Sequence, residues 1–202
     1  MESDKGTGSG LKPIIAYGNS MLRKACDDVG NLDPMLDLLI NSLWETLDYS
    51  GGIGLAAPQI DDNHRIFVVN SKLMYNEIGN EQRTALFSGD QGIEDVFINA
   101  EIIEASDKVW KEQEGCLSIP GINELVERSW EIIVEYQDAD MILTRKQFSG
   151  YTAKVIQHEL DHTNGVLFID HLSALSKKLL MNKLKKVLDG KTETDYPIKY
   201  IK

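Results

Sequence analysis

Hydrophobic residues recur at helical spacing near both ends of the chain. The first such stretch has apolar side chains at Met35, Leu36, Leu39, Ile40, Leu43, Trp44 and Leu47. Asp33 and Pro34 come just before it and suit an N-cap and a first helical position. The pattern therefore predicts a helix from Asp33–Pro34 to Gly51–Gly52. Two later helices are expected, over Tyr151 to Thr163, ending at Asn164–Gly165, and over Ser173 to Leu188.

Apolar runs typical of strands lie between these helices. Strands are predicted at 65–70, 96–98 and 102–103, and a hairpin at 130–136 and 141–148 turns around residues 138–140. Residues 71–94 have no strong period and form an unusually long connection. Because strands cluster in the middle, we expect an α+β fold, with mixed or antiparallel sheets around the central helix 151–163 and with an N-terminal and a C-terminal helix.

A chain of 202 residues suits one domain with one sizeable core. Residues 1–10 are polar and glycine-rich, which indicates a disordered leader or a cloning remnant; they lack the apolar core of a signal peptide and the arginines of a transit peptide. We expect a single catalytic domain over 11–190 and a polar C-terminal tail over 191–202. No apolar run reaches the length of a membrane helix, so a cytoplasmic protein without a membrane partner is expected.

The formal net charge of -11 argues against a broad surface for binding DNA. Lysines nevertheless crowd the last predicted helix, at Lys177, Lys178, Lys183, Lys185 and Lys186. The simpler interpretation is a solvated helix face, and the alternative is a docking helix for a polyanionic partner. The two cysteines, Cys26 and Cys116, are not expected to form a disulfide in a cytosolic chain.

The run 157–162, Gln-His-Glu-Leu-Asp-His, carries the clearest chemistry. His158 and His162 are four residues apart and share one face of a helix, so both imidazoles can bind one metal ion. Glu159 lies close to that face, where a carboxylate is more useful as a base for a metal-bound water than as a ligand. The alternative is a pair of surface histidines on an amphipathic helix.

A catalytic metal usually takes three protein ligands, so a third is needed. Phe168 stands where metzincin proteases carry a third histidine, His171 is out of register, and Glu193 lies in the polar tail. A ligand downstream of the helix is therefore not expected. Cys116 is the upstream candidate, because a thiolate completing a Cys-His-His set suits ferrous iron or zinc. Taken alone, it could equally be a small buried hydrophobic residue.

Three segments together identify a known family. Residues 52–59 (Gly-Ile-Gly-Leu-Ala-Ala-Pro-Gln), 114–118 (Glu-Gly-Cys-Leu-Ser) and 157–162 occur in the order and approximate separation of peptide deformylases. The chain strongly resembles this family from about Leu11 to Leu175. The resemblance implies hydrolytic removal of the N-formyl group from formyl-methionyl chains, with release of formate.

The same resemblance implies that Cys116, His158 and His162 bind one divalent metal. Fe²⁺ is the expected native ion, and Zn²⁺, Ni²⁺ or Co²⁺ could replace it in purified protein. A metal-bound water would be the nucleophile, with Glu159 as general base and then general acid. The Gln59 side-chain amide and the Leu117 backbone N–H match the family's oxyanion donors. For Gln59, the alternative is a surface loop glutamine.

Further residues are expected at the substrate site. Gly54 would let the substrate backbone approach and would leave room for a formyl hydrogen but for little more. Ile53, Tyr151 and Val155 are expected to line the pocket for the methionine side chain; the alternative is that they are ordinary core residues. Extended substrate is expected to pair with an exposed strand edge. Glu114 and Gly115 belong to the motif at this site; Gly115 would allow unusual backbone angles. Glu114 and Arg128 are expected to pair and fix the cysteine loop.

Some segments depart from the family pattern. The connection 71–94 is longer than in compact members, Ala100 replaces part of a usual Asn-Pro pair, and the tail after Gly190 has no match. Two other functions were considered: a zincin-type metallopeptidase, and a silent metal-binding or ribosome-associated protein on a deformylase scaffold. The expected partners are nascent formyl-methionyl polypeptides, with ribosomal RNA as a candidate partner for the lysine-rich helix.

Overall fold

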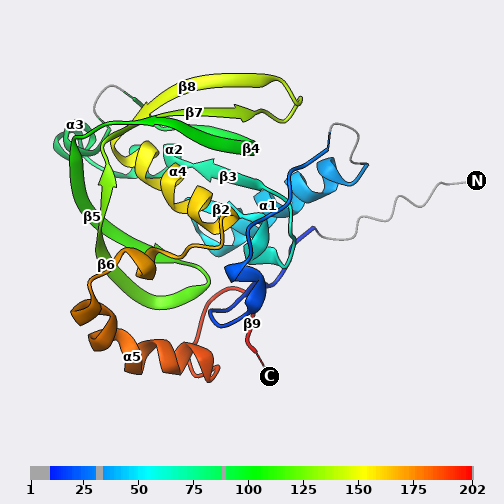
Figure 1. Ribbon diagram of the computed structural model, residues 1–202, viewed down its shortest axis with the longest axis vertical. Helices are drawn as coiled ribbons and strands as arrows, with labels where there is room; N and C mark the ends of the chain where they lie inside the picture. The colour runs from blue at the N-terminus through cyan, green and yellow to red at the C-terminus, as the bar shows by residue number, and fades with distance from the viewer. Residues whose placement is uncertain (1–9, 31–33, 88–89, 202) are drawn as a thin grey trace, which may run out of the picture.

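A computed structural model describes residues 10–30, 34–87 and 90–201 of the chain. Helix α4 (Gly150–Thr163) lies at its centre, with sheets on either side (Figure 1). The fold is α+β, as predicted. The remaining helices are α1 (Leu36–Ser50), α2 (Ser71–Glu77), α3 (Asn80–Leu86) and α5 (Ala174–Leu188), with short 3₁₀ helices η1 (Ser20–Arg23), η2 (Ala57–Ile60) and η3 (Phe168–His171).

The largest sheet has five antiparallel strands in the order β2-β3-β4-β7-β8. They are β2 (Gly54–Ala56), β3 (Ile66–Asn70), β4 (Glu94–Ala105), β7 (Glu131–Gln137) and β8 (Leu143–Ser149). A long antiparallel hairpin, β5 (Val109–Cys116) and β6 (Ile119–Ser129), forms a second sheet. Strands β1 (Ile14–Ile15) and β9 (Ile198–Lys199) form a short parallel pair.

Alternating side chains of β3 build the core on both faces of the five-stranded sheet. Ile66 and Val68 pack in a cluster with α1, whereas Phe67 and Val69 pack in a cluster with α4. Successive strand residues point to opposite faces, so the two helices cover opposite sides of this sheet. All five residues of β3 are buried, which explains why its sequence is a continuous apolar run.

The predicted helices and hairpin are present, with differences at two positions. Helix α1 begins at Leu36 with Met35 as its N-cap, so Pro34 lies before the helix and Asp33 lies outside the described residues. The two short strands predicted at 96–98 and 102–103 are one strand, β4, whose pairing with β7 shifts register after Ile98. Asn99 has a φ angle of 52° at this irregularity, and its side chain bonds both backbone groups of Val29.

Residues 71–94 are not an unstructured connection, because they contain α2 and α3. Neither helix shows an apolar stripe: the only buried residue in α2 is Ser71, and α3 has none. Helical periodicity requires a buried face, so the sequence carried no signal for them. The hairpin β5–β6 was also missed, because the side chains that alternate inward along β5 include Glu112 and the buried Glu114, so no apolar alternation marks the strand.

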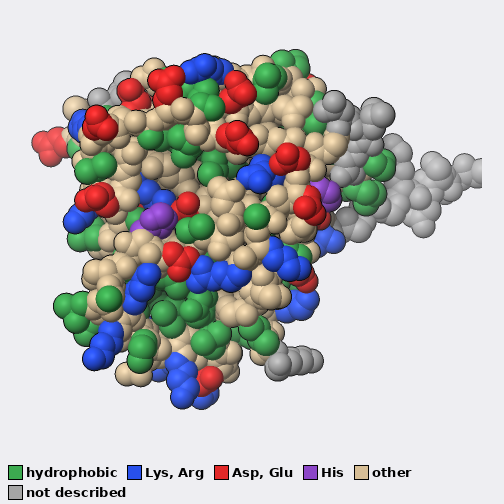
Figure 2. Space-filling model, viewed as in Figure 1, with side chains coloured by type: hydrophobic (Ala, Val, Ile, Leu, Met, Phe, Trp, Pro, Cys, Tyr) green, Lys and Arg blue, Asp and Glu red, His purple; other side chains and the backbone are tan. Residues whose placement is uncertain are grey.

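Exposed apolar and basic side chains are interspersed on α5. Figure 2 shows green and blue side chains mixed over the lower part of the molecule, where Figure 1 places this helix. Leu175, Leu179 and Met181 are more than half exposed. Every helix in the described part of the chain falls short of the length and hydrophobicity that a membrane crossing needs.

Candidate active site

Helix α4 carries the two histidines into the interior. It begins at Gly150, whose φ angle is 56° and whose missing Cβ would lie 2.2 Å from the Leu86 carbonyl oxygen, so only glycine fits there. His158 and His162 are both buried, and their ring centroids are 5.0 Å apart. The predicted spacing therefore does place both imidazoles side by side, and the surface-histidine interpretation is wrong.

Cys116 reaches the same place from the end of β5. Its Sγ atom lies 3.2 Å from Nε2 of His162, and one ligand atom from each of Cys116, His158 and His162 lies within 4.8 Å of the others. Both cysteines are free thiols, as expected; Cys26 is buried elsewhere, with its N–H donated to the Thr163 carbonyl. A sulfur and two nitrogens at this separation suit a divalent transition metal.

Glu114 orients one of these histidines. Its Oε2 lies 2.8 Å from Nδ1 of His158, and Arg128 donates to its two oxygens over 2.8 and 3.0 Å. Burial opposes ionisation of Glu114, but the bonds from His158 and Arg128 prevail and hold its pKa well below the usual range. The ionised carboxylate keeps the proton of His158 on Nδ1, which leaves Nε2 as a lone-pair donor, so the three residues fit a metal.

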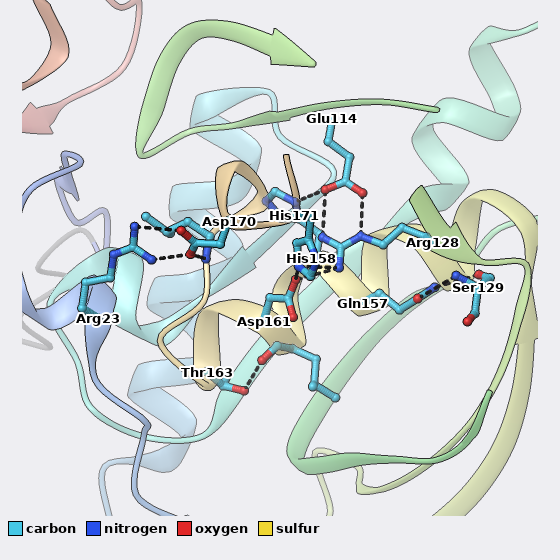
Figure 3. Close-up of polar contacts among 12 residues, drawn as sticks. Arg23, Glu114, Arg128, Ser129, Gln157, His158, Asp161, Thr163, Asp170 and His171 are labelled. Carbon is cyan, nitrogen blue, oxygen red and sulfur yellow. Dashed lines mark hydrogen bonds and ion pairs between the residues drawn. The ribbon is translucent and has the colours of Figure 1, made fainter. Parts of the chain in front are cut away.

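The same ion-pair network fixes α4 against the β5–β6 hairpin (Figure 3). Arg128 also donates to Oδ2 of Asp161 over 2.7 Å, and Asp161 in turn binds His171 at 2.7 Å. The Gln157 side chain bonds both the N–H and the carbonyl of Ser129. The predicted pairing of Glu114 with Arg128 is thus confirmed, and it extends into a buried network that neither α4 nor β6 could form alone.

Glu159 is buried, and its Oε2 has no hydrogen-bond partner among the described residues. Burial raises the pKa of its carboxyl group to about 7, against the lowering effect of His158. Gly54 lies directly against it: a Cβ at position 54 would be 2.5 Å from Oε1. An unpartnered carboxyl group that titrates near neutral pH is suited to accept and return a proton.

Gln59 and Leu117, the two predicted oxyanion donors, both lie next to Cys116: Leu117 follows it in the chain, and Gln59 comes from η2. The Gln59 side chain is 2% exposed, so it is not a surface loop residue; its Oε1 accepts from the Ala56 N–H, and its Nε2 lies 3.6 Å from Cys116 Sγ and 3.3 Å from Ser118 Oγ. Leu117 occupies the turn between β5 and β6. The fixed amide of Gln59 therefore presents N–H groups towards the cysteine.

Gln59, Cys116, Leu117, His158 and Glu159 all line one cavity of about 600 Å³. Its wall includes all the residues predicted for the substrate site: Ile53, Gly54, Glu114, Gly115, Tyr151 and Val155. Ile53, Tyr151 and Val155 also pack in the α4 core cluster, so core packing is confirmed for them, and their role as walls of a methionine pocket stays a prediction. The carboxylate of Glu114 is already held by Arg128 and His158.

Gly115 has a different reason for being glycine than the one expected. Its φ angle is not in the positive region; instead, a Cβ there would lie 2.2 Å from Oδ1 of Asn123, its partner across the hairpin. The expectation of unusual backbone angles was therefore wrong, and close packing replaces it as the cause.

Sequence reasoning missed several parts of the cavity wall, among them residues 119–123, Lys154 and residues 193–196. Lys154 is buried and donates to the Gln113 carbonyl of β5 over 2.9 Å; it lies four residues before His158, so its position on the metal face of α4 was a usable signal. The C-terminal residues 193–196 also line the cavity. Nothing in their sequence indicates this, because the contact depends on the path of the chain after α5.

Phe168 occupies the position where metzincin proteases carry their third histidine, and His171 contacts Arg128 and Asp161 instead. Phe168 is buried and its ring lies against that of His158, with centroids 6.1 Å apart. Before Phe168, the chain turns at Gly165, which has a φ angle of 73°, as the predicted helix end requires. This geometry disfavours the zincin-type interpretation.

The sequence of the chain is similar to those of known proteins whose family agrees with the geometry of this site. The family model described as polypeptide deformylase matches residues 11–178. The chain is 38% identical over 192 residues to a peptide deformylase of Christiangramia forsetii, covering 94% of this chain and 96% of that protein. It is 39% identical over 188 residues to one of Salinibacter ruber, covering 93% and 94%.

Solved structures show the same likeness. A peptide deformylase of Plasmodium falciparum superposes with a TM-score of 0.75 at 34% identity, covering 88% of this chain and 95% of that one. A plant peptide deformylase superposes with a TM-score of 0.77 at 29% identity, covering 91% of each chain.

Proposed function

The chain belongs to the peptide deformylase family and is a hydrolase that removes the N-formyl group from new polypeptides, and we propose the following roles for its residues. Cys116, His158 and His162 hold the metal, Glu159 moves the proton, and Gln59 and Leu117 stabilise the oxyanion. The observation that carries this proposal is the unpartnered Oε2 of the buried Glu159, which lines the same cavity as Cys116 and His158; a ligand atom of His162 lies within 4.8 Å of theirs.

One divalent metal is expected per chain. Its sulfur and nitrogen donors suit Fe²⁺, which we propose as the native ion, and also Zn²⁺, Ni²⁺ or Co²⁺. When bound, the metal supplies a Lewis acid that makes water nucleophilic near neutral pH. The Cys116 thiolate adds negative charge to the site, which makes a nearby proton acceptor more necessary.

Glu159 is that acceptor. With a pKa of about 7 from burial, its carboxylate takes the proton of the attacking water and its carboxylic acid returns one to the leaving nitrogen. The formyl C–N bond breaks, and formate and a free amine are released. During the attack, the Gln59 amide and the Leu117 N–H donate to the oxygen that gains charge.

The free edge of β5 offers a place for the substrate backbone. Within the described part of the chain, β5 pairs only with β6, and Gln113, Glu114 and Gly115 of β5 line the cavity. An extended peptide can add to such an edge as a further strand. We propose that the methionine side chain enters between Ile53, Tyr151 and Val155, and that Gly54 and Glu159 leave room for formyl but not for acetyl.

The lysine-rich helix α5 remains a proposed docking surface for ribosomal RNA near the site where nascent chains emerge, in the cytoplasm. All five of its lysines are exposed, and Lys177 also donates to the Asp170 carbonyl within the chain. Replacement of Lys178, Lys183 and Lys186 by Gln would lower co-sedimentation with ribosomes at low salt. Unchanged co-sedimentation would dismiss the proposal.

The proposed function is tested by formate release from formyl-Met-Ala-Ser by anaerobically purified, iron-loaded protein. Cys116→Ala should abolish release, whereas Cys26→Ala, which removes the other free cysteine, buried outside the cavity, should not. Cleavage of internal peptide bonds without formate release would favour the metallopeptidase, and inert protein with tightly bound metal would favour the silent scaffold.

A further inference from the structure

The C-terminal segment after α5 returns to the active site. Strand β9 pairs in parallel with β1, through Ile14 N–H to the Pro197 carbonyl and Ala16 N–H to the Lys199 carbonyl, both at 2.9 Å. Figure 1 shows this last segment, coloured red, rising from the end of α5 beside the blue N-terminal segment. The pairing anchors the residues just before it, 193–196, along the wall of the cavity.

Tyr196 makes the closest connection from this segment to the site. Its hydroxyl donates to the carbonyl of Leu117 over 2.8 Å. The ring is half-buried and packs beside Leu117 against the core cluster that contains α1. A phenol with a buried ring and a single carbonyl acceptor holds that acceptor in one place.

The turn that contains Leu117 has few other restraints. Cys116 pairs with Ile119, so Leu117 and Ser118 alone connect the two strands. The Ser118 carbonyl accepts from the Tyr17 N–H at 2.8 Å, and the Ser118 hydroxyl contacts the Gln59 amide. For the backbone of Leu117 itself, the Tyr196 hydroxyl is the contact that limits rotation of its carbonyl, and hence the ψ angle of Leu117.

We infer that Tyr196 is a positioning residue for the active site, and that residues 193–196 form a functional part of the wall of the substrate cavity. By holding the Leu117 carbonyl, Tyr196 restrains the position of the Leu117 Cα, and through it keeps the N–H of the preceding peptide unit aimed at the oxygen that gains charge. This inference rests on the proposed role of Leu117. An oxyanion donor must be preorganised to act, so loss of the hydroxyl should slow turnover more than it weakens substrate binding.

The chain offers a matched control. Tyr200 lies in the same segment, and its hydroxyl also donates to a backbone carbonyl, that of Thr192, but it does not contact Leu117. Tyr196→Phe and Tyr200→Phe each remove one phenol hydroxyl and keep the ring. Any general loosening of the C-terminal segment should affect both variants, whereas an effect through Leu117 should appear only in the first.

The experiment measures kcat and KM for formyl-Met-Ala-Ser in the zinc-loaded proteins, with amide hydrogen exchange of Leu117 followed by NMR. Loss of one oxyanion donor costs on the order of 10²–10³ in turnover. Tyr196→Phe should lose part of that, roughly 5- to 50-fold in kcat with KM within about twofold, and should exchange the Leu117 amide at least about tenfold faster. Tyr200→Phe should match wild type in both.

Equal kcat and equal exchange in Tyr196→Phe and wild type would overturn the inference, as would equal losses in the two variants. If wild type itself released no formate, the proposed function would fail, and the exchange rates would still decide whether Tyr196 restrains Leu117.

Discussion

The carboxylate of Glu159 occupies the space where a side chain at position 54 would begin. A Cβ added to Gly54 would lie 2.5 Å from Oε1 and 2.8 Å from Cδ of Glu159. Gly54 of β2 and Glu159 of α4 therefore depend on each other. They meet because α4 packs across the five-stranded sheet, of which β2 is an edge strand. Glu159 in the motif 157–162 therefore requires a glycine at position 54 in the motif 52–59.

Gly54→Ala should displace the Glu159 carboxylate and lower kcat about 100-fold or more, since misplacement by an ångström can cost that much. Metal content should stay unchanged, because none of the ligands is touched. Gly79→Ala is the control, since no atom lies within 4 Å of its missing Cβ. Formate release and metal analysis of both variants check this; near wild-type kcat in Gly54→Ala would contradict it.

Glu159→Gln should keep the metal and lower kcat by roughly 10²–10⁴, because proton transfer by a positioned acid or base contributes about that much. Glu159→Ala should behave alike. Metal is quantified by elemental analysis and turnover by formate release. Activity within tenfold of wild type would remove Glu159 as the proton carrier.

Glu114→Gln should weaken metal binding about 10- to 100-fold, because it removes the charge that holds the proton of His158 on Nδ1. It also leaves Arg128 buried without its main partner, so thermal stability should fall. Glu127→Gln, which breaks an exposed ion pair with Lys111 on the same hairpin, is the control. Competition with a metal chelator measures the affinity; equal affinities in the two variants would exclude this role for Glu114.

Lys154 should make stability depend on pH in the alkaline range. Burial lowers its pKa from 10.5 to about 8. Between these values the unfolded chain keeps the proton and the folded chain releases it, so this group makes the free energy of unfolding rise with pH. Below pH 8 both states are charged, and above 10.5 both are neutral.

The control for this effect is Lys154→Met, which cannot titrate. The free energy of unfolding of wild type relative to the variant should rise between pH 7.5 and 10.5 by an amount approaching about 3 kcal/mol, as the shift in pKa implies. Urea unfolding of both zinc-loaded proteins at several pH values measures it. A difference that stays flat across this range would show that Lys154 is not desolvated.

Glu193 and Asp195 should favour a basic residue downstream of the substrate methionine. Both are exposed and line the cavity, and exposed charge pairs contribute about 0.2–1 kcal/mol each, or a roughly two- to thirtyfold preference together. The double variant Glu193→Gln, Asp195→Asn should lose the preference for formyl-Met-Ala-Lys over formyl-Met-Ala-Glu in kcat/KM.

The control removes the same charge elsewhere, by Asp37→Asn with Glu81→Gln, both exposed and outside the cavity. The preference should also shrink at high salt, since ions screen exposed charges. No preference in wild type, or equal preference in all three proteins, would show that the carboxylates do not face the substrate.

The sequence by itself determined the elements with a buried face and the residues with unusual chemistry. Helices α1 and α4 and strand β3 carry apolar patterns that match their periods, and the spacing of His158 and His162 requires one shared helix face. Glu159 could be singled out by its place beside the two histidines, whereas Gln59 and Cys116 were assigned roles only through the resemblance of their motifs to peptide deformylases.

Only the tertiary structure decided how these segments meet. Helices α2 and α3 bury almost none of their side chains, so no apolar periodicity in the sequence predicts them. The reason why Gly54 and Gly115 are glycines lies in distant side chains, Glu159 and Asn123. The place of Tyr196 beside Leu117 follows from the β1–β9 pairing. Such contacts join residues far apart in the chain, and local periodicity and composition carry no information about them.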